Sequence, residues 1–298
     1  MIENFEQLKK AACKGEGKKL VVADAAGKSV IEALKQAHDM GMISPLLVGD
    51  KAKIEPLLEE VSLNEAQIVH ETDPNAIAAK SISLIRDGEG DMLMKGKLST
   101  PILMKAVLDK EKGLRKGKLL SHTAIMGVEG YPKLLIVTDG GIVINPDLAE
   151  KASILNNAYD VAKGLGIDTP RVACLAAIEK ITDKQPETLH AVQLTKMAER
   201  HQLQPMIVEG PIAADVLLSE DAAKAKGIET DMTLNADIAL VPNIAVGNVM
   251  VKSLIYLAGA KVAGLVMGAS CPIVLLSRSD TAEIKLLSIA AGCLTSSI

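Results

Sequence analysis

Short apolar runs alternate with helical patterns along most of this 298-residue chain. Before residue 110, four such runs each lead into a helical pattern, and they lie at residues 20–23, 45–48, 67–69 and 92–94. The helical patterns that follow them lie near residues 29–40, 53–61, 75–86 and 102–108. Parallel strands need a crossover connection, which is usually a helix. The alternation therefore predicts a mainly parallel sheet covered by helices.

The alternation breaks once, near residues 127–141. Two strand-like runs, 119–126 and 134–138, are joined there by a segment that contains Gly130 and Pro132, which predicts a hairpin or a crossing point instead of a β-α-β unit. After a helical pattern at 147–165 the alternation resumes, with strand-like runs at 172–178, 206–208, 237–241, 262–267 and 273–276. Helical patterns lie between them near residues 187–201, 221–226 and 246–257. We therefore expect two α/β domains.

Five polar residues, 277–281, stand between the last apolar run and a helical pattern at 282–293. They begin with Ser277 and Arg278, and Arg278 is one of five arginines among 33 basic residues. Ligands bind at the carboxyl ends of strands in open α/β sheets, and a helix amino terminus attracts anions. The stretch predicts an anion site, with phosphate as the first candidate.

The same stretch also fits a helix cap. Asp280 followed three residues later by Glu283 matches a capping box, and Ser279 or Thr281 could cap equally well. That interpretation accounts for the two carboxylates but leaves the serine–arginine pair before them unexplained.

Composition narrows the range of partners. A net charge of −4 and the absence of Trp, with one Phe and three Tyr, argue against nucleic acid, which needs basic surface or stacking aromatic residues. The four cysteines are far apart and the five histidines lack metal-ligand spacing, so we expect reduced thiols and no metal. The amino terminus is unlike a signal peptide and no apolar run reaches membrane-spanning length, which predicts a cytoplasmic protein without membrane contact.

Further polar clusters follow other strand-like runs, and each also fits an ordinary turn. One of them, Thr138 to Gly141, carries two glycines that allow close backbone approach. His122 alone fits a structural histidine better than an acid–base catalyst. The cluster at residues 95–100 contains two lysines, a glycine and two hydroxyls, and it fits a phosphate site or a capped, solvated turn. Their repeated position predicts a cleft between the domains. The candidate binding residues are Lys97, Ser99, Thr100, Ser121, His122, Gly210, Pro211, Asn243, Gly247, Asn248 and Lys252.

The sequence does not match the motifs of other nucleotide-binding folds or of hydrolases. Residues 26–29, A-G-K-S, follow a strand-like run and open a helix, but a P-loop needs a glycine where Val22 stands. The G-x-G triplets lack the third glycine of a dinucleotide site, and no G-x-S-x-G elbow occurs.

Four motifs together resemble the phosphate acetyl/butyryltransferase family. They are L-S-R at 276–278, E-G-P at 209–211, V-P-N-I-A-V-G-N at 241–248 and T-D-G-G-I-V-I-N-P at 138–146. The resemblance spans essentially the whole chain and is closer to the butyryl branch, because of S-H-T-A-I-M, T-D-G-G and S-R-S-D-T-A-E.

This resemblance implies transfer of an acyl group between coenzyme A and inorganic phosphate: butyryl-CoA and phosphate give butyryl phosphate and coenzyme A. It also implies a homodimer or higher oligomer, no metal or redox cofactor, and two α/β/α domains with an interdomain cleft, similar to isocitrate and isopropylmalate dehydrogenases. In that fold the last strand and helix return to the first domain. The implied domains are residues 1–130 plus 272–298 and residues 131–271.

The resemblance also implies catalytic roles. Ser277 matches a serine that stabilises the transition state, and Arg278 matches an arginine that binds phosphate or the coenzyme. The family's carboxylate base falls at Ile284 in this chain, so Glu283 or Asp280 must serve instead. We favour Glu283, with Asp280 as the helix cap. Thiol attack near neutral pH requires such a base, because a free thiol has a pKa of about 8.5.

Three alternatives remain: an acetyl-specific enzyme of the same family, a metal- and nicotinamide-dependent decarboxylating dehydrogenase on the same fold, and a non-catalytic anion-binding protein. The sequence contains neither the acidic metal cluster nor the cofactor motifs that such a dehydrogenase needs. Acyl chain length cannot be derived from sequence, because one methylene changes selectivity by only ~1–3 kcal/mol.

Overall fold

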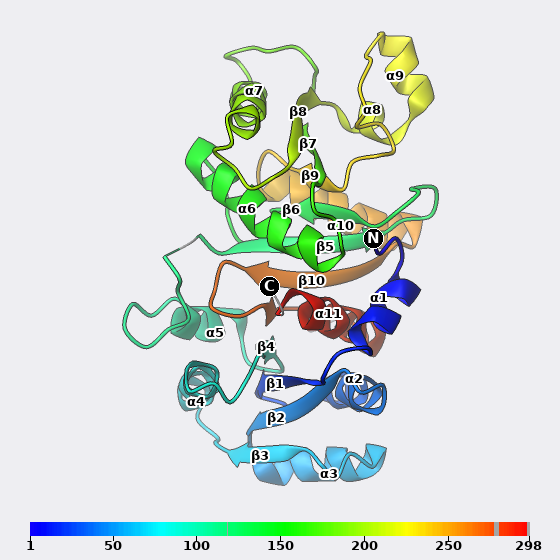
Figure 1. The fold of residues 1–298 in the computed structure, drawn as a ribbon. Helices are drawn as coiled ribbons and strands as arrows, with labels where there is room; N and C mark the ends of the chain where they lie inside the picture. The colour runs from blue at the N-terminus through cyan, green and yellow to red at the C-terminus, as the bar shows by residue number, and fades with distance from the viewer. Residues whose placement is uncertain (118, 277–279, 297–298) are drawn as a thin grey trace. The chain divides into compact units, whose positions relative to one another are not determined.

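The computed structural model describes residues 1–117, 119–276 and 280–296. Contacts divide the chain into two compact units. The terminal unit consists of Glu6–Lys118 and Ala263–Ile298, and the central unit consists of Met1–Phe5 and Leu119–Val262 (Figure 1). The predicted domain boundaries, 1–130 plus 272–298 and 131–271, stay a prediction.

The terminal unit contains a sheet with the order β3-β2-β1-β4-β11-β10. The first five strands of this order are parallel to one another, and β10 is antiparallel to β11. The strands are β1 (Lys18–Ala23), β2 (Ile43–Gly49), β3 (Gln67–His70), β4 (Met92–Lys95), β10 (Lys261–Met267) and β11 (Ile273–Val274). The four predicted strand–helix units before residue 110 are therefore confirmed.

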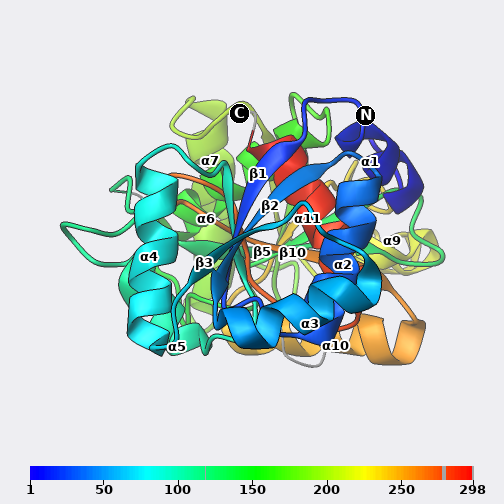
Figure 2. The same cartoon turned by 90° about the horizontal axis from the view of Figure 1, so that it is seen from below.

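Helices cover both faces of this sheet: α4 and α5 lie on one side of β1, β2 and β3, and α2, α3 and α11 lie on the other (Figure 2). The helices of the unit are α1 (Phe5–Ala12), α2 (Lys28–Asp39), α3 (Lys51–Val61), α4 (Pro74–Arg86), α5 (Thr100–Val107) and α11 (Ala282–Thr295). The Asp73 carboxylate caps α4 by accepting the N–H groups of Asn75 and Ala76, and Pro74 fills the first turn as its position in the sequence predicts.

The central unit contains a sheet with the order β5-β6-β9-β7-β8. Its strands are β5 (Ser121–Gly127), β6 (Leu135–Thr138), β7 (Arg171–Leu175), β8 (Ile207–Ile212) and β9 (Ile238–Leu240). β5 and β6 are antiparallel, which favours the hairpin over the crossing point that the sequence also allowed, and the other pairs are parallel. The helices are α6 (Leu148–Gly164), α7 (Pro186–Glu199), α8 (Ala214–Leu218), α9 (Glu220–Lys226) and α10 (Ile244–Ala258).

One prediction in this unit was wrong in detail. β8 continues to Ile212, so Gly210 and Pro211 lie inside the strand and do not follow it. A proline is tolerated there because β8 is the last strand of the order and its outer edge needs no ladder N–H. The short helix α8 was also not predicted.

The helices of the described residues are all too short or too polar to cross a lipid bilayer.

Candidate active site

The terminal unit has a topological switch point between β1 and β4. From β1 the chain continues to β2 and β3 on one side, and β4 and β11 lie on the other side. Ligands of open α/β sheets bind outside the carboxyl ends of the strands at such a point. A cavity of about 560 Å³ lies there, lined by residues that follow β1, β4 and β11, among them Gly27, Lys97 and Leu276.

Lysines dominate the lining of this cavity. Lys28, Lys95, Lys97 and Lys285 contribute to it, and Glu32 is the carboxylate among its lining residues. Such a set of cations favours an anionic ligand.

Two of these lysines are almost fully buried. Lys95 is 5% exposed and Lys285 is 4% exposed. The Lys95 ammonium donates to the carbonyl of Gly96 at 3.3 Å, and the Lys285 ammonium donates to the carbonyl of Asp280. Burial lowers the pKa of Lys285, and the nearby Asp280 carboxylate opposes this shift.

The start of α2 adds backbone donors to the cavity. Its N-cap is Gly27, which has no side chain to cap the helix. Gly27, Lys28 and Ser29 all line the cavity. Uncapped N–H groups and the helix dipole favour an anion at this end. Gly96 is also required, because a Cβ there would lie 2.0 Å from the carbonyl oxygen of Asp24.

Of the candidates predicted near β4, Lys97 lines this cavity. Ser99 instead is the N-cap of α5 without a side-chain capping bond, and Thr100 is the helix's first residue. Lys95, the first residue of the predicted phosphate cluster, also lines the cavity, whereas the sequence reasoning missed Lys28 and Lys285. The A-G-K-S segment at 26–29, rejected as a P-loop, was the signal that could have located Lys28, because it lies between a strand and a helix.

The predicted pair Ser277 and Arg278 lies outside the described residues. Leu276, the residue before the pair, lines the cavity. Beyond it, the expected helix α11 begins at Ala282.

The assignment of Asp280 as the cap of α11 was wrong. Thr281 is the N-cap, and its hydroxyl accepts the N–H of Ile284 at 3.3 Å. A hydroxyl in the extended residue before the first turn reaches this N–H directly, and Asp280 is one residue too far back. Asp280 is half-buried and Glu283 is exposed, so both carboxylates remain candidates for the base.

In the central unit, Asp139 organises the carboxyl end of β6. Its carboxylate is 2% exposed and accepts the N–H of His122 at 3.0 Å. It also accepts the N–H groups of Gly141, Ile142 and Val143, at 2.7, 2.9 and 3.2 Å. One buried carboxylate thus fixes the loop after β6 against the start of β5.

Two glycines bring the start of α10 against this loop. A Cβ on Gly247 would lie 2.7 Å from the Cα of Gly140, and the side-chain amide of Asn248 donates to the Gly140 carbonyl at 3.3 Å. Asn243 caps α10 by accepting the N–H of Val246. The structure therefore brings together His122, Gly140, Asn243, Gly247 and Asn248.

The other central-unit candidates lie differently. Ser121 is fully buried and its hydroxyl accepts a hydrogen bond from the Asn157 amide at 2.8 Å. Lys252 lies on α10, more than two turns from its start, and is exposed. Gly210 contacts β7, because a Cβ there would lie 2.7 Å from the Cβ of Cys174.

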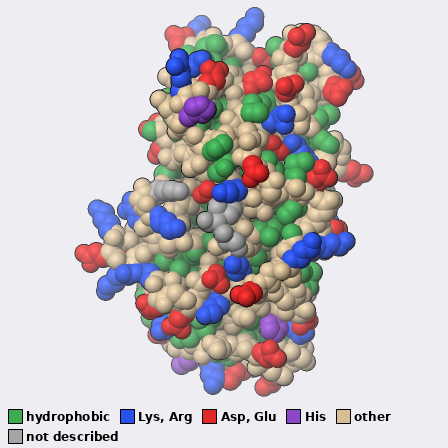
Figure 3. All heavy atoms as spheres, viewed as in Figure 1, with side chains coloured by type: hydrophobic (Ala, Val, Ile, Leu, Met, Phe, Trp, Pro, Cys, Tyr) green, Lys and Arg blue, Asp and Glu red, His purple; other side chains and the backbone are tan. Residues whose placement is uncertain are grey.

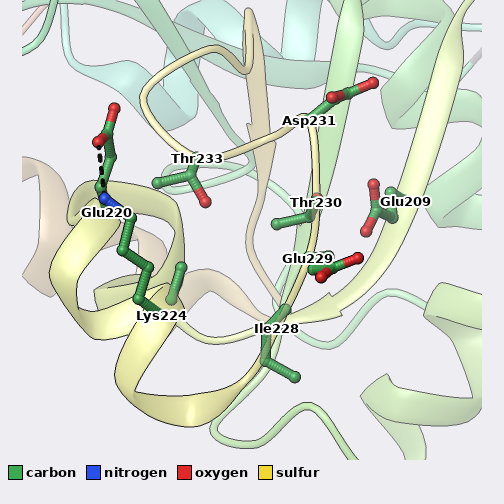
Figure 4. A pocket seen from close by; sticks show the side chains of 9 residues that line it. Glu209, Glu220, Lys224, Ile228, Glu229, Thr230, Asp231 and Thr233 are labelled. Atoms are coloured by element: carbon green, nitrogen blue, oxygen red, sulfur yellow. Dashed lines mark hydrogen bonds and ion pairs between the residues drawn. The ribbon is translucent and has the colours of Figure 1, made fainter.

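A larger cavity of about 640 Å³ in the central unit has the opposite charge (Figure 4). Its lining includes four carboxylates and Lys224, and that lysine pairs with Glu220 at 3.5 Å. Carboxylates repel phosphate, so the basic cavity of the terminal unit fits an anionic substrate better despite its smaller volume. Charges of both signs are mixed over the face shown in Figure 3, so the basic character of that cavity is local.

The described cysteines are all free thiols, and no group of three His, Cys, Asp or Glu side chains in the described residues is arranged to hold a metal. Burial raises the pKa of Cys271 to about 12, so this thiol is protonated near neutral pH.

These features define an α/β protein with a basic, phosphate-compatible cavity at the carboxyl edge of a parallel sheet. The model of the family described as phosphate acetyl/butaryl transferase matches residues 59–292. Phosphate butyryltransferase of Clostridium acetobutylicum is 40% identical over 296 residues, which cover 99% of this chain and 98% of that protein. Phosphate acetyltransferase of Rhizobium meliloti is 41% identical over 276 residues, which cover 92% of this chain and 87% of that protein.

Solved structures agree with the sequence comparisons. The crystal structure of a branched-chain phosphotransacylase from Enterococcus faecalis V583 is similar, with a TM-score of 0.82 and 30% identity. The matched region covers 94% of this chain and 99% of the Enterococcus faecalis chain. The protein belongs to the phosphate acetyl/butyryltransferase family, as its sequence motifs predict.

Proposed function

We propose that this protein transfers a short-chain acyl group between coenzyme A and inorganic phosphate, with butyryl-CoA and phosphate as one substrate pair and butyryl phosphate and coenzyme A as the other. The observation that carries the proposal is the lysine-lined cavity at the β1/β4 switch point, in a chain that belongs to this family along its whole length. All of these substrates except the acyl tail are anionic, and cations with helix N–H groups suit them.

The reaction needs a bound phosphate, a stabilised oxyanion and a proton carrier. A phosphate oxygen attacks the thioester carbonyl, the C–S bond breaks, and the coenzyme leaves as a thiolate that takes up a proton. In this proposal the cavity lysines hold the phosphate. Ser277 and Arg278 act on the oxyanion and on phosphate or the coenzyme, as the family resemblance implies. Glu283, or else Asp280, carries the proton to and from the thiol.

The butyryl preference rests on the butyryl-like segments of the sequence. Among the relatives, the Clostridium acetobutylicum protein supports it, whereas the Rhizobium meliloti protein keeps acetyl transfer as the second candidate. The dehydrogenase alternative has no support from the family match. The likeness to isocitrate and isopropylmalate dehydrogenases, the cleft between domains and the cytoplasmic location stay predictions.

A homodimer is part of the proposal, and the exposed side of α10 supports it. This helix is almost wholly apolar, with Lys252 as its charged residue, yet Val249, Tyr256 and Leu257 are 65%, 74% and 86% exposed. Contiguous exposed apolar side chains mark interaction surfaces. We expect a second copy to cover them, and Val249→Lys should shift the mass measured by light scattering from dimer to monomer. A wild-type protein that is monomeric at micromolar concentration would refute this part.

Release of coenzyme A from butyryl-CoA tests the function. It should depend on added phosphate, exceed the rate with acetyl-CoA, and be insensitive to a metal chelator, because we propose that no metal or redox cofactor takes part. Absence of activity with every acyl-CoA tested, or loss of activity in the presence of a chelator, would refute the proposal.

A further inference from the structure

Lys285 lies in an unusual position for a lysine. It is one turn into α11, it is 4% exposed, and it lines the basic cavity together with Lys95 and the start of α2. Among the described residues, its ammonium finds its hydrogen-bond acceptor in the backbone carbonyl of Asp280, which carries no full charge.

A buried ammonium is costly to keep unless an anion or several acceptors compensate it. The Asp280 carbonyl satisfies one of three N–H donors. The remaining donors belong to a side chain that lines a cavity large enough for a phosphate group. A dianionic ligand would add its negative charge to that of the nearby Asp280 carboxylate and would supply the missing acceptors.

We propose that Lys285 binds the attacking inorganic phosphate inside this cavity, and that phosphate binding is coupled to uptake of a proton by the Lys285 amine at alkaline pH. The inference rests on the proposed function and adds a binding residue that the family resemblance did not identify.

The charged groups around Lys285 determine whether phosphate binding takes up or releases a proton. Lys28 and Glu32 face the cavity from α2, Lys95 from the end of β4 and Lys97 from the loop after it, and Asp280 precedes α11. Glu283 is on α11 itself.

Burial lowers the pKa of Lys285, so as pH rises its amine becomes neutral before an exposed lysine does. An arriving dianion favours the ammonium and raises that pKa again. Phosphate binding must then weaken as pH rises through the lowered pKa, and binding there must draw in a proton.

Calorimetric titration of the whole protein with inorganic phosphate, from about pH 8 to about pH 10, tests this coupling, because phosphate stays a dianion and exposed lysines stay charged over most of that range. The wild type should lose affinity with rising pH and take up protons, seen as a dependence of the heat on the buffer's ionisation enthalpy. A wild-type affinity that is flat across this range would overturn the proposal without any variant.

Lys285→Met removes the positive charge and keeps a side chain of similar length. At the lower end of the range it should bind phosphate about 10- to 100-fold more weakly, and its affinity should not change with pH. Lys80→Met, which removes an exposed lysine of α4, should behave as the wild type. Replacing a buried charge by an apolar side chain of similar length is often neutral or stabilising, and a melting curve checks this.

A titration with coenzyme A shows whether Lys285 binds inorganic phosphate or a phosphate group of the coenzyme. Lys285→Met should bind coenzyme A as the wild type does, and its KM should rise for phosphate but not for acyl-CoA. Unchanged phosphate binding in Lys285→Met, or weakened binding of coenzyme A alone, would overturn the inference. If phosphate binds as described but no acyl-CoA is turned over, the proposed function fails while this anion site stands.

Discussion

The carboxylate of Asp139 accepts the backbone N–H of His122 at 3.0 Å, which ties the end of β6 to the start of β5. The same side chain accepts three further N–H groups from the loop that follows it. A carboxylate suits this position because it accepts hydrogen bonds at both oxygens and donates none.

Asp139→Asn should therefore lower the stability of the protein. The amide nitrogen would face two of these N–H donors, and a buried donor left without an acceptor costs about 1–3 kcal/mol. We expect an earlier midpoint in urea or thermal unfolding. Asp168→Asn, a change at an exposed aspartate, should leave the midpoint within experimental error. Equal midpoints for the two variants would show that the four bonds contribute nothing.

Glu283 is the favoured base, and the structure removes the helix-capping role of Asp280. Glu283→Gln should lower turnover by roughly 10²–10⁴ with little change in melting temperature. Asp280→Asn should retain turnover. If Asp280→Asn stops catalysis and Glu283→Gln does not, the assignment is reversed.

Thr281 provides a control for stability at the same helix end. Thr281→Ala should cost ~0.5–2 kcal/mol of stability, because it removes the cap of α11, and should leave turnover largely intact. A variant as stable as the wild type would show that this cap is dispensable.

Arg278 should not tolerate lysine in its place. If its guanidinium grips a phosphate group, Arg278→Lys loses the two-pronged hydrogen bonding while it keeps the charge. We expect kcat/KM to fall by about 10- to 100-fold, the equivalent of ~1.5–3 kcal/mol. Wild-type kinetics in a folded Arg278→Lys variant would leave Arg278 a structural residue.

The cysteines should take no part in the chemistry. Burial raises the pKa of Cys174, Cys271 and Cys293 to about 12, so near pH 8 only about one thiol in ten thousand is ionised. Iodoacetamide on the native protein should modify Cys13, which is partly exposed, and leave turnover intact. Loss of activity together with modification of Cys271 in a mass spectrum would contradict this expectation.

The elements that the sequence predicted well are those with a local cause. The strand–helix units before residue 110 follow from hydrophobic periodicity, and the cap of α4 follows from Asp73 and Pro74 standing side by side. The position of Lys97 in a basic cavity could be predicted because it follows a strand and precedes a helix.

What could not be predicted depends on packing between distant segments. A buried lysine such as Lys285 looks in sequence like any lysine on a helix, and its burial depends on the packing of α11 against α2 and β11. Pro211 argued for a turn, and only the place of β8 at the edge of its sheet allows it inside a strand. The choice between Asp280 and Thr281 as cap depends on where the helix begins, the least predictable feature of any helix.

The stoichiometry of acyl phosphate formation tests the central claim most directly. Butyryl-CoA is mixed with the enzyme and phosphate, the released thiol is titrated, and the acyl phosphate is trapped with hydroxylamine. Transfer predicts one acyl phosphate for each thiol, with no thiol released when phosphate is left out. Thiol release that proceeds equally without phosphate and yields free butyrate would identify a thioesterase and contradict the account.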